Sequence, residues 1–416
     1  MNRREEKRKI DLLAPAGSFD SLQAAVKAGA DAVYFGFGKL NMRSRSSNNF
    51  SLEDLDRVVK ECREKNVKSY VTLNTVMYDD DLTLMKEMCD EMKKANVDAV
   101  IASDMAVIAY ARSIGLNVHL STQANVSNIE AASFYSRFVD LVVLARELRL
   151  QQIQEISRAI EKRNICGPSG RLLKVEAFVH GALCVAISGK CYMSLAQHNL
   201  SANRGECLQV CRRKYRVIEE ESGSELLIDN QYVMSPKDLC TIDVLDQIVG
   251  AGVSVLKIEG RGRSPEYVYT VVSSYREALD AIAQGTYSKE KVEKWSSDLR
   301  SVYNRGFWQG GYYLGNKLGE WSGAYGSVAT KKKIYVGKVS NYFDKIGVGE
   351  FLLEAHTLKK GDAIVITGPS TGVVKGFVES LRTHEKTSSA GKGETATIPV
   401  SQKIRRNDKL YVLVDR

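Results

Sequence analysis

The stretch Ile10–Phe35 reads IDLLAPAGSFDSLQAAVKAGADAVYF and contains one complete strand–helix–strand unit. The apolar run Ile10–Ala14 predicts a buried strand, and Ala32–Phe35 predicts the next one. Between them, Ser18–Ala28 has the apolar period of an amphipathic helix. Short and almost continuous apolar strands are typical of parallel sheets, because helices cover their faces. This unit therefore predicts an α/β fold.

Units of the same kind follow along the chain. The predicted strands are 10–14, 32–35, 69–74, 99–102, 118–121, 141–145, 175–179 and 253–258. The predicted helices are 18–28, 52–65, 81–94, 105–113, 129–138, 150–161, 238–249 and 266–283. Eight such units favour a closed TIM-like (β/α)8 barrel. An open doubly wound sheet is the alternative, but no Gly-x-Gly-x-x-Gly follows the first strand.

The last part of the chain has a different pattern. Short β runs separated by Gly, Pro, Asp and Asn predict a small antiparallel β-barrel domain over 332–416. We therefore divide the chain into a disordered basic tail (1–9), a catalytic barrel (10–328) and this β-barrel. Residues 331–416 hold 16 Lys and Arg against 9 Asp and Glu, which accounts for most of the net charge of +9. Such an excess favours a polyanionic partner, although a solvated surface would have the same composition.

The sequence also predicts the cellular compartment of the protein. No apolar run is long enough to span a bilayer, and the charged N-terminus lacks the apolar segment of a signal peptide. We expect a cytoplasmic protein without a membrane partner, whose eight cysteines are thiols or ligands rather than disulfides.

Four cysteines lie close together after the seventh predicted strand. Residues 176–211 read EAFVHGALCVAISGKCYMSLAQHNLSANRGECLQVC and contain Cys184, Cys191, Cys207 and Cys211. Only the last two have the close spacing of a zinc-ligand pair. Iron–sulfur clusters accept irregular spacing between thiolates, so a cluster is the favoured interpretation over zinc or inert buried thiols.

Polar residues follow the predicted strands, where barrel enzymes place their chemistry. These candidate site residues are Arg43, Asn74, Gln123, Asn125, Arg146, His180, Glu259, Arg261 and Arg263. The cysteine segment starts just after His180, so we expect it to lie over the same mouth of the barrel. A second candidate is the aromatic run 303–313, YNRGFWQGGYY, which could stack nucleobases or form a packing seam between domains.

Several motifs resemble peptidase family U32. They are Glu176-x-Phe178-x-x-Gly181-Ala182-Leu183-Cys184, Leu13-Ala14-Pro15-Ala16-Gly17, Ser121-Thr122-Gln123-Ala124-Asn125, Ser235-Pro236-Lys237-Asp238-Leu239 and Lys257-Ile258-Glu259-Gly260-Arg261. The family is named for a collagenase-like activity. It also includes tRNA hydroxylation proteins, which convert uridine 34 to 5-hydroxyuridine with prephenate as hydroxyl donor, an rRNA cytidine hydroxylase and ubiquinone-pathway hydroxylation factors.

The resemblance implies roles for the candidate residues. A 4Fe-4S cluster would be held by Cys184, Cys191, Cys207 and Cys211, although a ubiquinone-type pattern would exchange Cys211 for a later cysteine such as Cys240. Prephenate has two carboxylates, which guanidinium groups bind in a bidentate manner. This nominates Arg146, Arg261 and Arg263 as receptors for the donor. From their positions after the strands, Gln123, Asn125 and Arg43 are further substrate-binding candidates, and His180, Glu259 and Asn74 are the catalytic candidates.

The partners implied are the tRNA anticodon loop and prephenate, with a homo-oligomer or a paralogous subunit left open. The alternative is a peptidase. The chain has no His-Glu-x-x-His and no Gly-x-Ser-x-Gly, so a peptidase would have to use Cys184 or Cys191 with His180. Four clustered cysteines exceed what such a dyad needs, which favours the hydroxylase.

Overall fold

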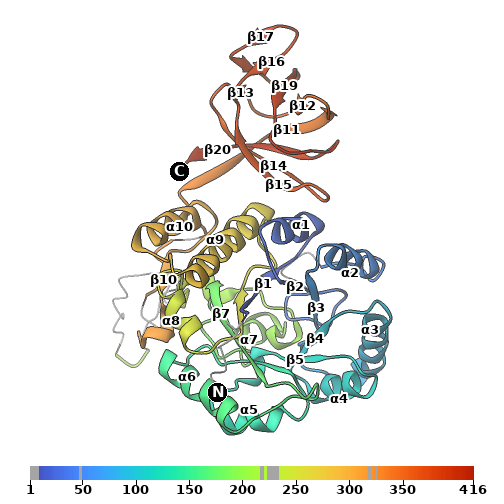
Figure 1. Ribbon diagram of the computed structural model, residues 1–416, viewed down its shortest axis with the longest axis vertical. Coiled ribbons are helices and arrows are strands. Elements are labelled where there is room, and N and C mark those ends of the chain that lie inside the picture. The colour runs from blue at the N-terminus through green and yellow to red at the C-terminus, as the bar shows by residue number, and fades with distance from the viewer. Residues whose placement is uncertain (1–8, 46–48, 216–219, 223–233, 317–319, 325) are drawn as a thin grey trace, which may run out of the picture.

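The computed structural model describes residues 9–45, 49–215, 220–222, 234–316, 320–324 and 326–416. Its larger part is a closed barrel of eight parallel strands ringed by helices (Figure 1). The barrel strands are β1 (Asp11–Pro15), β2 (Ala32–Phe35), β3 (Lys68–Thr72), β4 (Ala99–Ala102), β5 (Val118–Leu120), β6 (Leu141–Val143), β7 (Lys174–Gly181) and β9 (Val255–Ile258). Strand β9 pairs in parallel with both β1 and β7, which closes the sheet. The predicted (β/α)8 fold is therefore confirmed, and the open doubly wound sheet is not adopted.

Helices between the strands bury their apolar sides against the barrel. They are α1 (Phe19–Lys27), α2 (Leu55–Glu64), α3 (Leu82–Lys94), α4 (Met105–Ser113), α5 (Ile129–Tyr135), α6 (Leu150–Lys162), α8 (Leu245–Gly250) and α9 (Pro265–Gln284). Side chains cap the N-termini of some of these helices. The Ser18 side chain accepts a hydrogen bond from the Ser21 N–H at the start of α1, and the Asn128 side chain accepts one from the Ala131 N–H at the start of α5. These short caps orient the loops at the strand ends.

The predicted insertion follows β7. Its described residues form α7 (Met193–His198) and two single 3-10 turns, and the segment then leads to β8 (Asp238–Cys240). The prediction of a helix starting at Asp238 was wrong, because 238–240 form a strand that is antiparallel to β7 and parallel to β10 (Phe307–Gln309). A buried ion pair between Asp238 and Arg305 fixes this extra strand pair, and the helix begins only at Leu245.

The C-terminal part is antiparallel, as predicted. Its strands are β11 (Lys331–Phe343), β12 (Val348–Leu353), β13 (Leu358–Lys359), β14 (Ala363–Gly368), β15 (Gly372–Phe377), β16 (Leu381–Arg382), β17 (Lys386–Thr387), β18 (Ser389–Ala390), β19 (Thr395–Pro399) and β20 (Lys409–Asp415). Eight of them form one sheet in the order β15-β14-β20-β11-β12-β19-β16-β17, and β13 pairs with β18. Phe351, Leu353 and their neighbours form a separate apolar core.

The two parts are packed against each other. Val365 and Val373 belong to the apolar core of the barrel, next to α1 and α9. Lys333 pairs with Glu266 at 2.9 Å, and Lys375 donates to Thr270 at 2.7 Å. The predicted tail lies almost entirely outside the described residues, since residues 1–8 are not among them. Among the described residues, no helix is both long enough and apolar enough to cross a bilayer.

Candidate functional site at the barrel mouth

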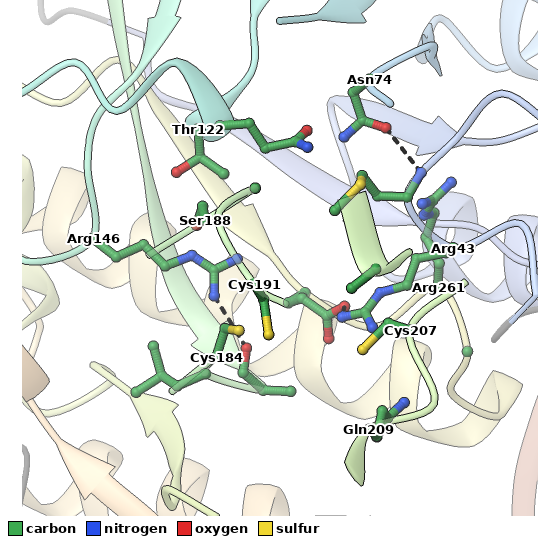
Figure 2. Close-up of a pocket in the computed structure, with 18 of the residues that line it drawn as sticks. Arg43, Asn74, Thr122, Arg146, Cys184, Ser188, Cys191, Cys207, Gln209 and Arg261 are labelled. Carbon is green, nitrogen blue, oxygen red and sulfur yellow. Dashed lines mark hydrogen bonds and ion pairs between the residues drawn. The ribbon is translucent and has the colours of Figure 1, made fainter. Parts of the chain in front are cut away.

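A cavity of about 260 Å³ opens where the barrel strands end. Its floor and one wall come from strand ends and the loops after them, and the cysteine segment forms the opposite wall (Figure 2). The predicted site residues that line it are Arg43, Asn74, Gln123, Arg146, Glu259, Arg261, Arg263, Cys184, Cys191, Cys207 and Cys211. These residues follow six different barrel strands, and the closure of the barrel brings them to one place.

All four predicted ligand cysteines line this cavity as free thiols. Figure 2 shows the sulfur atoms of Cys184, Cys191 and Cys207 between the guanidinium groups of Arg146 and Arg43. Burial raises the pKa of the Cys211 thiol to about 11, and burial also raises the pKa of Cys191. Metal binding counteracts such a shift, because a coordinated thiol is deprotonated.

The arrangement of the four thiols can be compared with the needs of a single ion and of a cluster. In the described part of the chain, no three His, Cys, Asp or Glu side chains meet closely enough to hold a single metal ion. In a 4Fe-4S cubane each thiolate binds its own iron, so the four sulfur atoms surround a larger volume. Four thiols around one cavity with cationic walls fit a group of that kind. Cys240 lies elsewhere, buried in β8, where it pairs with His180 of β7.

The cysteine segment is fixed by hydrogen bonds to its neighbours. Arg212 donates to the carbonyl oxygens of Leu183 and Pro236, and Asn203 accepts from the Cys191 N–H at 3.3 Å. The turn out of β7 requires Gly181, which has φ +108°. A Cβ there would lie 2.5 Å from the carbonyl oxygen of Glu259, so only glycine allows the two strand ends to approach.

Arginines surround Glu259 on the other side of the cavity. Arg43 Nη2 lies 3.0 Å from Glu259 Oε1. Burial alone would raise the pKa of Glu259, but the neighbouring guanidinium groups, above all that of Arg43, lower it below its usual value. Arg261 is buried and donates to Thr72 Oγ1 at 2.7 Å, and this burial lowers its pKa to about 10. Glu259 and Arg261 are therefore both charged at neutral pH.

Arg146 lines the cavity, and one N–H group of its guanidinium has no hydrogen-bond partner among the described residues. Its Nη1 donates to the Ala182 carbonyl oxygen at 3.3 Å, and its guanidinium carbon lies 4.0 Å from the centroid of the Phe178 ring. Its Nε is buried and has no hydrogen-bond partner among the described residues. A buried donor of this kind is costly unless a ligand accepts from it, so Arg146 is suited to bind an anionic group in the cavity.

Two predicted residues lie outside the cavity. The ring of His180 packs against Tyr275 and Phe307, and burial lowers its pKa to about 3. A register shift between Phe178 and His180 in the pairing of β7 with β9 separates the two side chains, so Phe178 lines the cavity and His180 does not. Asn125 instead donates to the Ser188 carbonyl oxygen and so supports the cysteine loop.

The aromatic run after α10 (Lys289–Ser301) packs into the apolar core of the barrel domain. Trp308 and Arg305 are both buried, and the Trp308 ring packs edge-on against Tyr312. Neither Trp308 nor Arg305 is exposed enough to stack an incoming base. The run therefore packs within the barrel domain, neither stacking bases nor forming the seam between domains that was the other interpretation.

Lys257, which the sequence presented only as part of a motif and not as a candidate site residue, also lines the cavity. Its Nζ lies 2.7 Å from Glu176 Oε1, in an ion pair that is almost completely buried. The same ammonium lies 4.8 Å from the centroid of the Tyr34 ring. Strand alternation could have found it, because Lys257, Glu259 and Arg261 stand two residues apart and share one side of β9 and its extension.

The fold and the cavity define a (β/α)8 protein with thiols and guanidinium groups gathered at the barrel mouth. The model of peptidase family U32 matches residues 17–323, and the chain belongs to this family. The resemblance in the motifs is thereby confirmed.

Named relatives divide between two activities. A protein of Porphyromonas gingivalis named collagenase is 56% identical over 403 residues, which cover 97% of each chain. A protein of Methanocaldococcus jannaschii named uncharacterized protease is 40% identical over 409 residues, covering 97% of this chain and 98% of the relative. The tRNA hydroxylation protein P1 of Bacillus subtilis is 32% identical over 388 residues, covering 90% and 87%.

Proposed function

We propose that this protein hydroxylates uridine 34 of tRNA to 5-hydroxyuridine, with a 4Fe-4S cluster on the four cavity cysteines and prephenate as hydroxyl donor. One observation carries the proposal: the four thiols and the arginines around Glu259 line the same cavity. Redox chemistry and the binding of a dicarboxylate need these two groups of side chains in one place. The similarity to a protein named for tRNA hydroxylation supports the same activity.

The proposed reaction is U–H + D–OH → U–OH + D–H, where D–OH is prephenate. The C5–H bond of uridine and the C–OH bond of the donor break, the base is oxidised by two electrons, and the donor accepts these two electrons and the proton. A 4Fe-4S cluster supplies one-electron redox capacity when bound. Side chains of the protein would position the donor. Arg146 and Arg261 would bind its carboxylates, and Arg43 would keep Glu259 ionised beside them. The cavity volume of about 260 Å³ is on the scale of a small donor, while a nucleobase would have to enter from the open side.

The cavity gives less support to the peptidase alternative. Peptide hydrolysis by cysteine needs an activated thiolate beside a base. Here the cysteines face arginines and a glutamate, whereas His180 packs among aromatic rings with a pKa lowered to about 3 by burial. This geometry does not form the dyad that the peptidase alternative requires.

Purified protein tests the proposal directly. Anaerobically prepared protein, incubated with unmodified tRNA and prephenate, should yield 5-hydroxyuridine in nuclease digests, and omission of prephenate should abolish it. A collagen-like peptide is the parallel substrate. Cleavage of that peptide without any hydroxylated nucleoside would establish the peptidase instead.

A further inference from the structure

Three large side chains are exposed beside the mouth of the cavity. Tyr192 is 70% exposed, Tyr78 is 58% exposed and Ile187 is 56% exposed. Tyr192 directly follows Cys191, and Ile187 itself lines the cavity. Exposed aromatic and apolar groups gathered at the entrance of a site mark an interaction surface rather than solvated surface. We call Tyr78, Ile187, Lys190, Tyr192 and Arg204 the tyrosine rim.

The two tyrosines come from loops that are far apart in sequence but joined in space. The Cys191 N–H donates to Asn203 Oδ1 at 3.3 Å, and the Val76 N–H donates to the Asn203 carbonyl oxygen at 3.1 Å. Asn203 therefore links the cysteine turn that carries Tyr192 to the loop after β3 that carries Tyr78. The rim is a connected surface around the entrance.

The Tyr78 ring is held in place before any partner binds. The guanidinium carbon of Arg204 lies 4.1 Å from the ring centroid. Arg204 is itself fixed by an ion pair with Asp81, which also accepts from the Tyr78 N–H at 2.7 Å. A ring fixed in this way loses little conformational freedom when a flat partner stacks on its exposed part.

The two sides of the rim differ in charge: Tyr78 is followed by Asp79, Asp80 and Asp81, the last of which pairs with Arg204, whereas the Tyr192 side is basic and is the side that would meet phosphates. Residues 184–215 contain five Lys and Arg and a single acidic residue, Glu206. Lys190 and Arg213 are exposed among them. Exposed aromatic rings interleaved with cations are the surface on which single-stranded nucleic acid binds, because the rings stack bases and the cations meet phosphates.

We propose that the tyrosine rim stacks the unpaired bases that flank the reacting nucleotide of an RNA loop, with Tyr192 and Tyr78 as the two platforms. This inference rests on the proposed function and adds to it the surface that recognises the RNA. Flanking bases stacked on the rim would leave the nucleotide between them facing the cavity, since Tyr192 is adjacent in sequence to Cys191.

The test is the affinity of the holoprotein for an anticodon stem-loop RNA and for a fully paired duplex of the same length, measured by fluorescence anisotropy. Tyr192→Ala and Tyr78→Ala should each weaken stem-loop binding by about tenfold, because that is the usual effect of losing one base-stacking ring. Their duplex binding should stay unchanged. Tyr192→Phe keeps the ring and should bind the stem-loop as the wild type does.

Phe134→Ala is the matched control. Phe134 is also exposed and also carries an arginine, with the guanidinium carbon of Arg137 at 5.3 Å from the ring centroid, but it lies on the outer helix α5. The Phe134→Ala protein should bind both RNAs with the affinity of the wild type. Wild-type affinity in both Ala variants, or equal losses for stem-loop and duplex, would overturn the role of the rim while hydroxylation by the wild type still supports the proposed function. A wild type that neither binds stem-loop RNA nor hydroxylates tRNA would overturn both.

Discussion

Arg43 Nη2 and Glu259 Oε1 form a 3.0 Å ion pair that joins the loop after β2 to the end of β9. The pair lies on the cavity wall that faces the cysteines. It neutralises part of the positive charge there and leaves Arg146 with an unpaired buried Nε for a ligand. The cavity is therefore arranged to receive an anion beside a wall of cysteine thiols, and the following predictions test the cysteine side and the arginine side separately.

The four cysteines that line the cavity lead us to expect a bound iron–sulfur cluster. Protein purified without oxygen should be brown and contain about four irons per chain. Cys191→Ala and Cys207→Ala should each lose colour, iron and hydroxylation, because three thiolates hold a cubane poorly. Cys240→Ala is the control, since Cys240 lies buried in β8 and should leave the iron content unchanged. Stoichiometric zinc, or iron loss in the Cys240→Ala protein, would contradict the ligand assignment.

The arginines that line the cavity lead us to expect that Arg146 contributes to the binding of prephenate. Arg146→Lys keeps the charge but loses the planar edge of the guanidinium, so the KM for prephenate should rise about tenfold, equivalent to about 1.4 kcal/mol. The KM for tRNA should not change. Arg149→Lys, three residues further on and exposed, is the matched substitution and should behave as wild type in steady-state kinetics. An unchanged KM for prephenate in the Arg146→Lys protein would remove Arg146 from the donor site.

His180 should not titrate in the physiological range. Burial lowers its pKa to about 3, so the ring is neutral at any pH above about 4 and cannot act as a proton donor at neutral pH. Selective 13C labelling of histidine, with His180→Asn to assign the signal, should show a His180 resonance that stays constant between about pH 5 and 8, on both sides of the ordinary histidine pKa. A midpoint near the ordinary value would restore His180 as a catalytic candidate.

The C-terminal domain should contribute phosphate contacts. Lys359 and Lys360 are exposed beside Phe377, and Lys359→Glu/Lys360→Glu should lower tRNA affinity by about tenfold and reduce its salt dependence. Lys162→Glu at the end of α6, on the face of the barrel away from the mouth, is the control. Truncation is a poorer test, because Val365 and Val373 belong to the barrel core. Equal affinity and salt slope in the two charge variants would assign the domain a structural role.

The barrel could be predicted because its strands are short and mostly apolar and each is followed by a segment with the apolar period of a helix. The cysteines, Arg146 and Arg261 could be placed at the mouth for the same reason, since every parallel strand ends there. Local patterns could not reveal β8, because Asp238–Cys240 is short and its partner Phe307–Gln309 is distant in sequence. They also misplaced His180, whose direction depends on the register shift between β7 and β9.

The most direct measurement is nucleoside mass spectrometry of tRNA from cells that lack this protein and from the same cells complemented with the wild-type or the Cys191→Ala chain. The account predicts that 5-hydroxyuridine and its derivatives at position 34 disappear on deletion, return with the wild type and stay absent with Cys191→Ala. Normal 5-hydroxyuridine at position 34 in the deletion strain, in the absence of any paralogue, would contradict it.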